Sequence, residues 1–307
     1  MNTPAYVGTL AILAMTLITA TACADLDGVT PQNGTSAPAD WSPPFVATWN
    51  FDEASGTRAA SGGSCSAGSD CDLTDNNTVL QDTTNFKEGV ASADFTKVND
   101  ESLSCLNATC DELIAAPGDS FSYGCFARAD VDGSEIHFME VSNEASGLDG
   151  YKLIRGEGLD TIDCQVSDAG GSVTGTGVTD AWPVNVMTHA VCVFDNSADT
   201  IQAYINGKTS GSPATQDDVA ATSENFYIGT DAGLDINGQT DECFFIKQVL
   251  TDAQICRMCS CGIDGDNDIG NEKCLCSGAD PTVYAANGRN TTQCGGCTLP
   301  SCNAVAP

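Results

Sequence analysis

The residues best spaced for chemistry are acidic and lie near the C-terminal end of the sequence. Asp264, Asp266 and Asp268 occupy alternate positions of a glycine-containing loop, and Glu272 follows four residues later. Ca²⁺ prefers hard oxygen ligands, and carboxylates at this spacing can wrap around one ion. We therefore predict a calcium site in this loop, with a solvated acidic turn as the alternative.

Three aromatic residues could offer a surface to carbohydrate. The ring faces of tryptophan and tyrosine pack on sugar rings, and Trp182, Tyr151 and Tyr227 are available for this role. Trp182 stands beside Pro183 in an expected loop, so it is the strongest single candidate, whereas Trp49 is expected in the core. There is no conspicuous aromatic stripe, because Phe, Trp and Tyr make up only 7% of the chain.

Motifs for catalysis are missing from the sequence. Glycosidases built on antiparallel sandwiches carry Glu-x-Asp-x-x-Glu on one strand, which places the carboxylates on one face, about 5 Å apart, for a retaining mechanism. No glutamate here begins that pattern, and neither Gly-x-Ser-x-Gly nor His-Glu-x-x-His occurs. We therefore predict that the protein is not an enzyme.

The charge balance excludes two classes of partner. The 307 residues include 11 Lys and Arg against 42 Asp and Glu, giving a formal net charge of −31. A nucleic-acid binder needs a basic face to neutralise phosphates, and direct attraction to anionic lipid needs basic residues as well. We expect neither nucleic acid nor an anionic lipid surface as a partner. With 41% hydrophobic residues, the chain is expected to fold.

The N-terminal segment predicts export. Residues 1–22 carry no charged side chain, and the apolar run from Tyr6 to Ile18 is too short to span a bilayer as a helix, so 1–22 is predicted to be a signal peptide. The Ala-Thr-Ala sequence before Cys23 is similar to a bacterial lipobox, and lipidation of Cys23 would leave 16 of the 17 cysteines, an even number, free to pair. We expect a lipid on Cys23 as the sole membrane contact, with a freely secreted protein as the alternative. Residues 23–44 are rich in proline and small polar residues and predict an extended tether.

Residues 45–255 have the pattern of short β-strands. Apolar and polar residues alternate in runs that Gly, Asn, Asp or Ser separate, as expected of an antiparallel sandwich or barrel. Asn206-Gly207 is a favoured hairpin dipeptide, and Leu250 to Cys259 predicts the single helix, with Thr251 or Asp252 as its N-cap. The expected strands are 45–51, 121–127, 136–142, 151–155, 161–167, 189–195, 200–206, 226–230 and 243–249.

Cysteines divide evenly between two parts of the chain. Eight lie within 45–255 and eight in 256–307, a tail with few large apolar residues that must be stapled to hold a structure. We predict disulfides in the tail, with zinc at its Cys-x-x-Cys pairs as the alternative. Two local bridges are predicted because their cysteines are close in sequence within polar loops: Cys65–Cys71 and Cys105–Cys110.

Several segments of 45–255 resemble a laminin-G-like, concanavalin A-like jelly roll. The C-terminal half of that fold is similar to MTHAVCVFDNSADTIQAYINGK (187–208), SENFYIGTDAG (223–233) and NGQTDECFFIKQVLTDAQI (237–255). Upstream, WNFDEASG (49–56), GVASADF (89–95) and SFSYGCFARAD (120–130) match its first strands in order. The resemblance implies an all-β fold, a two-sheet antiparallel jelly-roll sandwich, followed here by a small Cys-rich irregular tail.

The resemblance also implies roles for individual residues. Its topology makes the strands of Cys125 and Cys243 neighbours, and likewise those of Cys164 and Cys192, which predicts two cross-strand disulfides. It assigns His189 a structural role. Laminin-G-like domains often bind calcium at a sheet rim, where three aspartates are candidate ligands, although the last of them also matches a structural position of the family: Asp231, Asp235 and Asp241.

Together these features predict an exported cell-surface binding or adhesion module. We expect it to recognise glycan or an extracellular protein, with Ca²⁺ as its candidate cofactor. Two alternatives remain open at this point: an accessory or degenerate polysaccharide-acting enzyme, and a structural subunit of an extracellular assembly. Fold alone does not choose among them.

Overall fold

The computed structural model describes residues 43–67, 70–131, 135–143, 147–156, 161–168, 173–176, 182–229 and 236–263. All of them belong to one compact unit, Ser36–Pro307. The predicted signal peptide, Cys23 and nearly all of the predicted tether lie outside the described residues, as does the tail beyond residue 263. Within the described ranges, no helix combines the length and apolarity needed to cross a bilayer.

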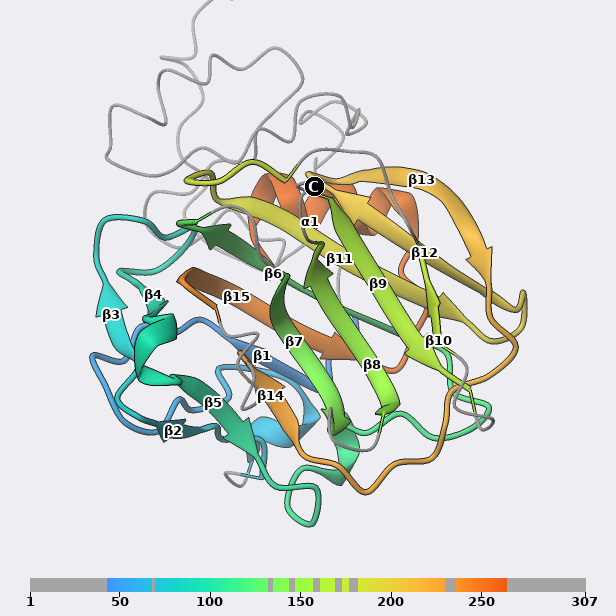
Figure 1. Ribbon diagram of the computed structural model, residues 1–307, viewed down its shortest axis with the longest axis horizontal. Helices are drawn as coiled ribbons and strands as arrows, with labels where there is room; N and C mark the ends of the chain where they lie inside the picture. The colour runs from blue at the N-terminus through green and yellow to red at the C-terminus, as the bar shows by residue number, and fades with distance from the viewer. Residues whose placement is uncertain are drawn as a thin grey trace, which may run out of the picture. The chain divides into compact units, whose positions relative to one another are not determined.

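Two antiparallel sheets form the body of the protein, and Figure 1 shows them as overlapping layers. The predicted jelly-roll sandwich is therefore confirmed. The eight-stranded sheet has the order β13-β12-β11-β6-β15-β4-β3, with β1 also paired to β15. Its strands are β1 (Ala47–Trp49), β3 (Leu80–Asp82), β4 (Ser92–Phe95), β6 (Phe121–Ala129), β11 (Thr188–Asp195), β12 (Thr200–Ile205), β13 (Lys208–Thr215) and β15 (Gly238–Ile246).

The seven-stranded sheet has the order β10-β9-β8-β7-β14-β5-β2. Its strands are β2 (Thr74–Asn76), β5 (Ser102–Cys105), β7 (Ile136–Asn143), β8 (Gly147–Arg155), β9 (Ile162–Ser167), β10 (Val173–Gly175) and β14 (Phe226–Ile228). Three short 3₁₀ turns, η2 (Ser64–Ala67), η3 (Lys97–Asn99) and η4 (Asp111–Leu113), connect strands of the two layers.

Aromatic side chains from both sheets fill the space between them. Tyr123 on β6 and Tyr151 on β8 face each other across the core, with ring centroids 4.6 Å apart. Both phenols are fully buried, and each finds an acceptor: the Tyr123 hydroxyl donates to the Lys152 carbonyl (2.9 Å) and that of Tyr151 to the Leu113 carbonyl (2.8 Å). Buried hydroxyls without such partners would be costly, so these two bonds fix the rings in place.

The predicted hairpin at Asn206-Gly207 joins β12 to β13. Asn206 and Gly207 have φ angles of 50° and 80°, the left-handed conformation that a tight turn between two twisted strands needs. The Asn206 side chain also accepts the amide N–H of His189 on β11 (3.1 Å). The turn is therefore tied to the third strand of this part of the sheet.

Among the described residues the one α-helix is α1 (Asp252–Cys261), which packs on the outer face of the eight-stranded sheet. Thr251 is its N-cap, as predicted, and forms a capping box in which the Gln254 side chain binds the Thr251 amide (2.9 Å). Met258 and, beyond the helix, Ile263 pack on apolar residues of β11, β12 and β15. The packed unit thus continues past residue 255, the expected boundary of the jelly roll.

Four disulfides join the eight cysteines of the sandwich in the predicted pairs: Cys65–Cys71, Cys105–Cys110, Cys125–Cys243 and Cys164–Cys192. Cys125–Cys243 links the neighbouring strands β6 and β15, as expected. Cys164–Cys192 differs, because β9 and β11 belong to different sheets, so this bridge crosses the core instead of joining adjacent strands. In the tail, Cys256 and Cys259 are also disulfide-bonded.

Candidate functional site

Two of the three aromatic residues predicted to bind sugar lie in the core. Trp182 is fully buried between the sheets, stacked on Phe138 with ring centroids 4.7 Å apart. Tyr151 is 1% exposed and packs on Tyr123 and Phe245. The surface role predicted for these two residues is wrong, because neither ring has a face that a ligand could reach.

The third residue, Tyr227, lies on the outer face of the seven-stranded sheet. Its neighbours on β14, Phe226 and Ile228, point into the core, so the alternation of the strand turns Tyr227 outward. The ring is partly exposed. In the sheet register Tyr227 is opposite Ser104 on one side and Glu140 on the other.

Tyr227 stands within a row of polar side chains that crosses six strands of the sheet. The register places these residues opposite one another in the order Gln165, Lys152, Glu140, Tyr227, Ser104 and Thr74. From Lys152 the row becomes more open toward β2: Lys152 and Glu140 are buried, Tyr227 and Ser104 are half-buried, and Thr74 is exposed, while Gln165 at the other end is half-buried. A ligand can therefore reach the β14–β5–β2 half of this face.

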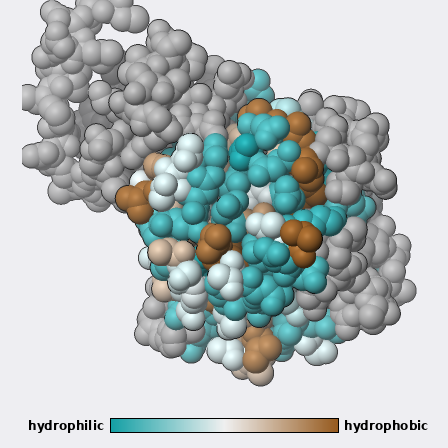
Figure 2. Space-filling view, turned by 60° about the vertical axis from the view of Figure 1, so that its left-hand side comes forward, coloured by the Kyte–Doolittle hydropathy of each residue, from teal (hydrophilic) through white to brown (hydrophobic). Residues whose placement is uncertain are grey.

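We name the open half the Tyr227 platform. Its six residues carry hydroxyl, amide or apolar side chains: Thr74, Asn76, Ser104, Leu106, Asn225 and Tyr227. Leu106 is 61% exposed and continues the outer face of β5 two residues beyond Ser104. Figure 2 shows a face of the molecule that is largely hydrophilic with separate hydrophobic spots.

Hydrogen bonds hold the polar groups of the Tyr227 platform in fixed positions. The Asn76 amide donates to the hydroxyls of Ser104 (2.9 Å) and of the buried Ser102 (3.2 Å). The Asn225 amide donates to the Tyr227 hydroxyl at 3.3 Å. The Ser104 hydroxyl accepts in its bond with Asn76, and a hydroxyl can donate as well as accept.

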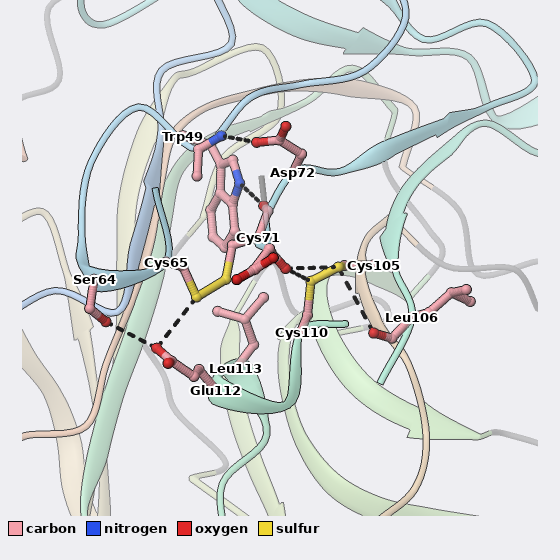
Figure 3. The surroundings of a disulfide bond; sticks show 12 residues. Trp49, Ser64, Cys65, Cys71, Asp72, Cys105, Leu106, Cys110, Glu112 and Leu113 are labelled. Carbon is pink, nitrogen blue, oxygen red and sulfur yellow. Dashed lines mark hydrogen bonds between the residues drawn. A yellow bond between two sulfur atoms is a disulfide. The ribbon is translucent and has the colours of Figure 1, made fainter. Parts of the chain in front are cut away.

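A turn closed by a disulfide is hydrogen-bonded to the platform residue Asn225. The turn 105–110 is closed by Cys105–Cys110 and carries Leu106 at its start (Figure 3). Within the turn, Asn107 donates its backbone N–H to the Asn225 side-chain oxygen (3.0 Å) and its side-chain amide to the Glu224 carbonyl (3.2 Å). A series of hydrogen bonds therefore links the disulfide-closed turn to Tyr227, through Asn107 and then Asn225.

A second disulfide, Cys65–Cys71, lies beside this turn. Leu113 lies between the two bridges in Figure 3. The carbonyl of Asp70 lies 2.7 Å from the Cys110 sulfur. Cys71 also accepts a hydrogen bond from the Trp49 indole through its carbonyl, at 2.9 Å. Cys65–Cys71 is thus linked to the buried Trp49 of the core.

Charged side chains occupy the covered part of the same row. His137 is buried and bonds Glu140 through Nδ1 (2.8 Å) and Glu135 through Nε2 (2.7 Å), while the Lys152 ammonium lies 3.5 Å from Glu140. Burial alone would lower the pKa of His137, but the bonds to Glu135 and Glu140 outweigh burial and raise that pKa above its ordinary value. Both basic side chains of the cluster thus have carboxylate partners.

The second histidine lies on the outer face of the other sheet. His189 is fully buried with its ring 4.5 Å from that of Phe126, and Lys87 lies over the Phe126 ring at 5.3 Å. Neither His189 nitrogen has a hydrogen-bond partner within the described part of the chain. Burial, with the nearby Lys87 charge, lowers the pKa of His189 to about 3. The side chain packs as an apolar group.

The predicted calcium ligands are described at one position only. Asp264, Asp266, Asp268, Glu272, Asp231 and Asp235 lie outside the described residues. Asp241 is buried and accepts the backbone N–H groups of Lys87 (2.5 Å), Glu88 (3.1 Å) and Glu242 (2.9 Å), so it fastens the β3–β4 connection to β15. Among the described ranges, no three His, Cys, Asp or Glu residues are grouped to hold a metal ion. Calcium remains a prediction.

Sequence reasoning singled out Tyr227 but missed the residues around it. Ser104, Leu106 and Asn225 are common residue types, and only the pairing of β5 with β14 brings them to one surface. Alternation along 102–106 does mark Ser104 and Leu106 as outward once β5 is known to be a strand. The partner strand is a long-range property that this pattern does not contain.

Comparison with known proteins places the fold in a recognised group. Residues 106–256 match the Laminin_G_3 family model, described as the concanavalin A-like lectin/glucanases superfamily. The resemblance drawn from the sequence is confirmed over this segment, which includes β6 to β15 and the platform residues Leu106, Asn225 and Tyr227. No curated protein matches the chain by sequence.

Two of the solved structures that share the architecture illustrate the likeness. One is domain 4 of AbnA, a GH43 extracellular arabinanase from Geobacillus stearothermophilus, in complex with arabinotriose: TM-score 0.53, 14% identity, 69% of this chain and 97% of that domain covered. The other is the binding domain of Paraclostridial Mosquitocidal Protein 1: TM-score 0.53, 9% identity, 71% of this chain covered and about half, 52%, of that one. At these identities the likeness establishes the fold alone.

Proposed function

We propose that the protein is a glycan-binding module and that the Tyr227 platform is its binding surface. One observation carries the proposal: a single partly exposed tyrosine stands at the centre of an outer sheet face, ringed by fixed amide and hydroxyl groups. The similar arabinanase domain, solved with arabinotriose, supports glycan rather than protein as the ligand class.

The chemistry of the platform suits a sugar chain. A sugar ring presents C–H groups on its faces and hydroxyls around its edge. Tyr227 and Leu106 offer apolar surface to the face, while Thr74, Ser104 and Asn76 can donate to and accept from the edge hydroxyls. Because Asn225 and Asn76 already hold neighbouring hydroxyls in place, little side-chain freedom is lost when a ligand binds.

A panel of soluble polysaccharides tests the proposal. We expect at least one member to bind the wild-type protein, and Tyr227→Ala to weaken that binding at least tenfold, because the stacking surface is removed. Tyr227→Phe keeps the ring and should lose less.

Leu106→Ala and Leu80→Ala form a matched pair within this test. Both leucines are more than half exposed, but Leu80 lies on β3 of the other sheet. Leu106→Ala should weaken binding and Leu80→Ala should not. Binding that is equal in wild type, Tyr227→Ala and Leu106→Ala would refute the platform as the site.

We propose a non-catalytic role. The carboxylate opposite Tyr227 in the register, Glu140, is buried and bonded to His137 and Lys152. A carboxylate held in this way is poorly placed to attack a sugar or to activate water for hydrolysis. The check is a reducing-end assay on each polysaccharide that binds. Turnover that Glu140→Gln abolishes would overturn this part of the proposal.

Location and calcium are proposed from the sequence. We propose export through the signal peptide and anchoring by a lipid on Cys23, which the intact mass of the purified native protein measures directly. Export without a lipid would leave a secreted module. For Ca²⁺ at Asp264, Asp266 and Asp268, calorimetry with the metal alone is the test. The absence of any binding heat from the wild-type protein would refute calcium binding, and an equal heat from the Asp266→Asn, Asp268→Asn double variant would refute this site.

A further inference from the structure

We infer that the Tyr227 platform selects uncharged glycans over those carrying carboxylate or sulfate groups, an inference that rests on the proposed function. Its starting point is the composition of the platform. None of its six residues has a side chain that is charged at neutral pH: Thr74, Asn76, Ser104, Leu106, Asn225 and Tyr227. In the whole chain, by contrast, charged residues make up 17%.

The cations on this sheet are already bonded. Among the described residues of its seven strands, the basic side chains are His137, Lys152 and Arg155. His137 and Lys152 are buried and bonded to Glu140, and His137 also to Glu135. Arg155 is fully buried with its Nε donating to the Trp182 carbonyl at 3.0 Å. Each of these basic groups is therefore buried and already has protein partners.

An anionic sugar would lose hydration at the platform without gaining a charged partner. Desolvating a carboxylate or sulfate is costly unless a cation or several donors replace the water. Neutral hydroxyls can exchange their water for the hydroxyl and amide groups of the platform at little cost. This local difference in desolvation predicts the selectivity.

The charge of the whole molecule adds a weaker, longer-range term. A net charge of −31 repels polyanions, but salt screens this repulsion beyond about 8 Å at 0.15 M ionic strength. The local cause and the long-range cause therefore respond differently to salt, and an experiment can separate them.

The experiment compares neutral polymers, arabinan and xylan, with anionic ones, polygalacturonate and heparin. Each is titrated into wild type and Tyr227→Ala at 0.15 M and 0.5 M NaCl. We expect Tyr227-dependent binding of a neutral polymer, and binding of the anionic polymers at least tenfold weaker at both salt concentrations. Recovery of anionic binding at 0.5 M would assign the selectivity to net charge and overturn the local explanation.

A gain-of-function pair sharpens the test. Thr74→Arg places a cation on the exposed edge of the platform, and Thr209→Arg adds the same charge to an exposed position on β13 of the other sheet. Thr74→Arg should bind polygalacturonate at least threefold more tightly than wild type, and Thr209→Arg should not. Equal affinities of the two variants would contradict the inference.

The two hypotheses fail in different ways. If no polymer, neutral or anionic, shows Tyr227-dependent binding, the proposed function is refuted. If an anionic polymer shows Tyr227-dependent binding as tight as that of the neutral ones, the platform stands as a glycan site and the selectivity alone is refuted.

Discussion

Trp182 and Phe138 stack face to face inside the sandwich, with ring centroids 4.7 Å apart and ring planes at 15°. Phe138 comes from a bulge in β7, and Trp182 lies just ahead of β11 in the opposite sheet. The pair therefore joins the two layers of the core. The Trp182 carbonyl also accepts from Arg155 on β8, so the contact extends to a third strand.

Replacing Trp182 with alanine should destabilise the fold. Loss of a fully buried indole leaves a cavity and typically costs about 3–5 kcal/mol, whereas Trp182→Phe retains part of the stack and should cost less. Guanidinium unfolding measures both effects. The folded fraction of either variant should keep its glycan affinity; a stable Trp182→Ala protein that had lost binding would restore a ligand role for this residue.

His137 should stabilise the fold most strongly at acidic to neutral pH. Its pKa is raised in the folded state, so its contribution is fully present below about 6.5, the unfolded-state value, and is lost as pH rises through the raised pKa. The difference in unfolding free energy between wild type and His137→Gln should shrink as pH rises above 6.5. A difference that grows with pH would contradict the His137–Glu140 ion pair.

His189 should show the opposite pH dependence. Its pKa is about 3 in the folded state, so the unfolded chain binds the proton first and stability falls as pH drops from 6.5 toward 3. The slope for this one group is about 1.4 kcal/mol per pH unit. His189→Gln should unfold with a shallower acid dependence than wild type. An unchanged acid slope would mean that other groups bind the protons.

Opening the Cys105–Cys110 disulfide should weaken glycan binding. The turn that it closes supports Asn225 through Asn107, and Asn225 holds the Tyr227 hydroxyl. We expect Cys105→Ser with Cys110→Ser to lose at least threefold in affinity. The matched control is Cys65→Ser with Cys71→Ser, a neighbouring bridge of similar span, five against six residues. Equal losses in both double variants would remove the specific role of the 105–110 turn.

The capping box of α1 should contribute measurably to stability. Thr251→Ala removes the hydroxyl that accepts the backbone N–H of Gln254 and should lower the free energy of unfolding by about 1 kcal/mol. Gln254→Ala removes the side-chain oxygen that accepts the backbone N–H of Thr251. Chemical denaturation checks both values. Because the two side chains form one unit, the double variant should cost less than the sum of the single ones. Full additivity would indicate that the two bonds act independently.

Features that depend on neighbouring residues were predictable from the sequence. The hairpin at Asn206-Gly207 requires only two residues that tolerate positive φ, and the start of α1 requires only Thr251 and its partner three residues later. The predicted hairpin implies a strand after Gly207, but the alternation pattern does not mark β13, because Lys208–Thr215 is polar and contains Pro213. These residues suit an edge strand, which carries no alternating apolar pattern.

Features that depend on distant residues were predicted less well. Trp182 next to Pro183 has the local composition of a surface loop, and only its contact with Phe138 shows that the indole enters the core. The Cys164–Cys192 pair was predicted correctly, but its position between the two sheets depends on how the layers stack, which pairing rules within a sheet do not describe. Burial of Tyr151 could have been inferred, since it alternates with Lys152 along β8.

The bridge between Cys125 and Cys243 also limits how far the molecule can be stretched. These residues are 118 positions apart in sequence, and the chain between them contains five strands of the seven-stranded sheet and three whole strands of the other sheet. A pulling force applied at the two ends of the sandwich would pass through the sulfur atoms and leave that loop unextended. The oxidised protein should therefore yield a much shorter contour length under tension than the reduced one.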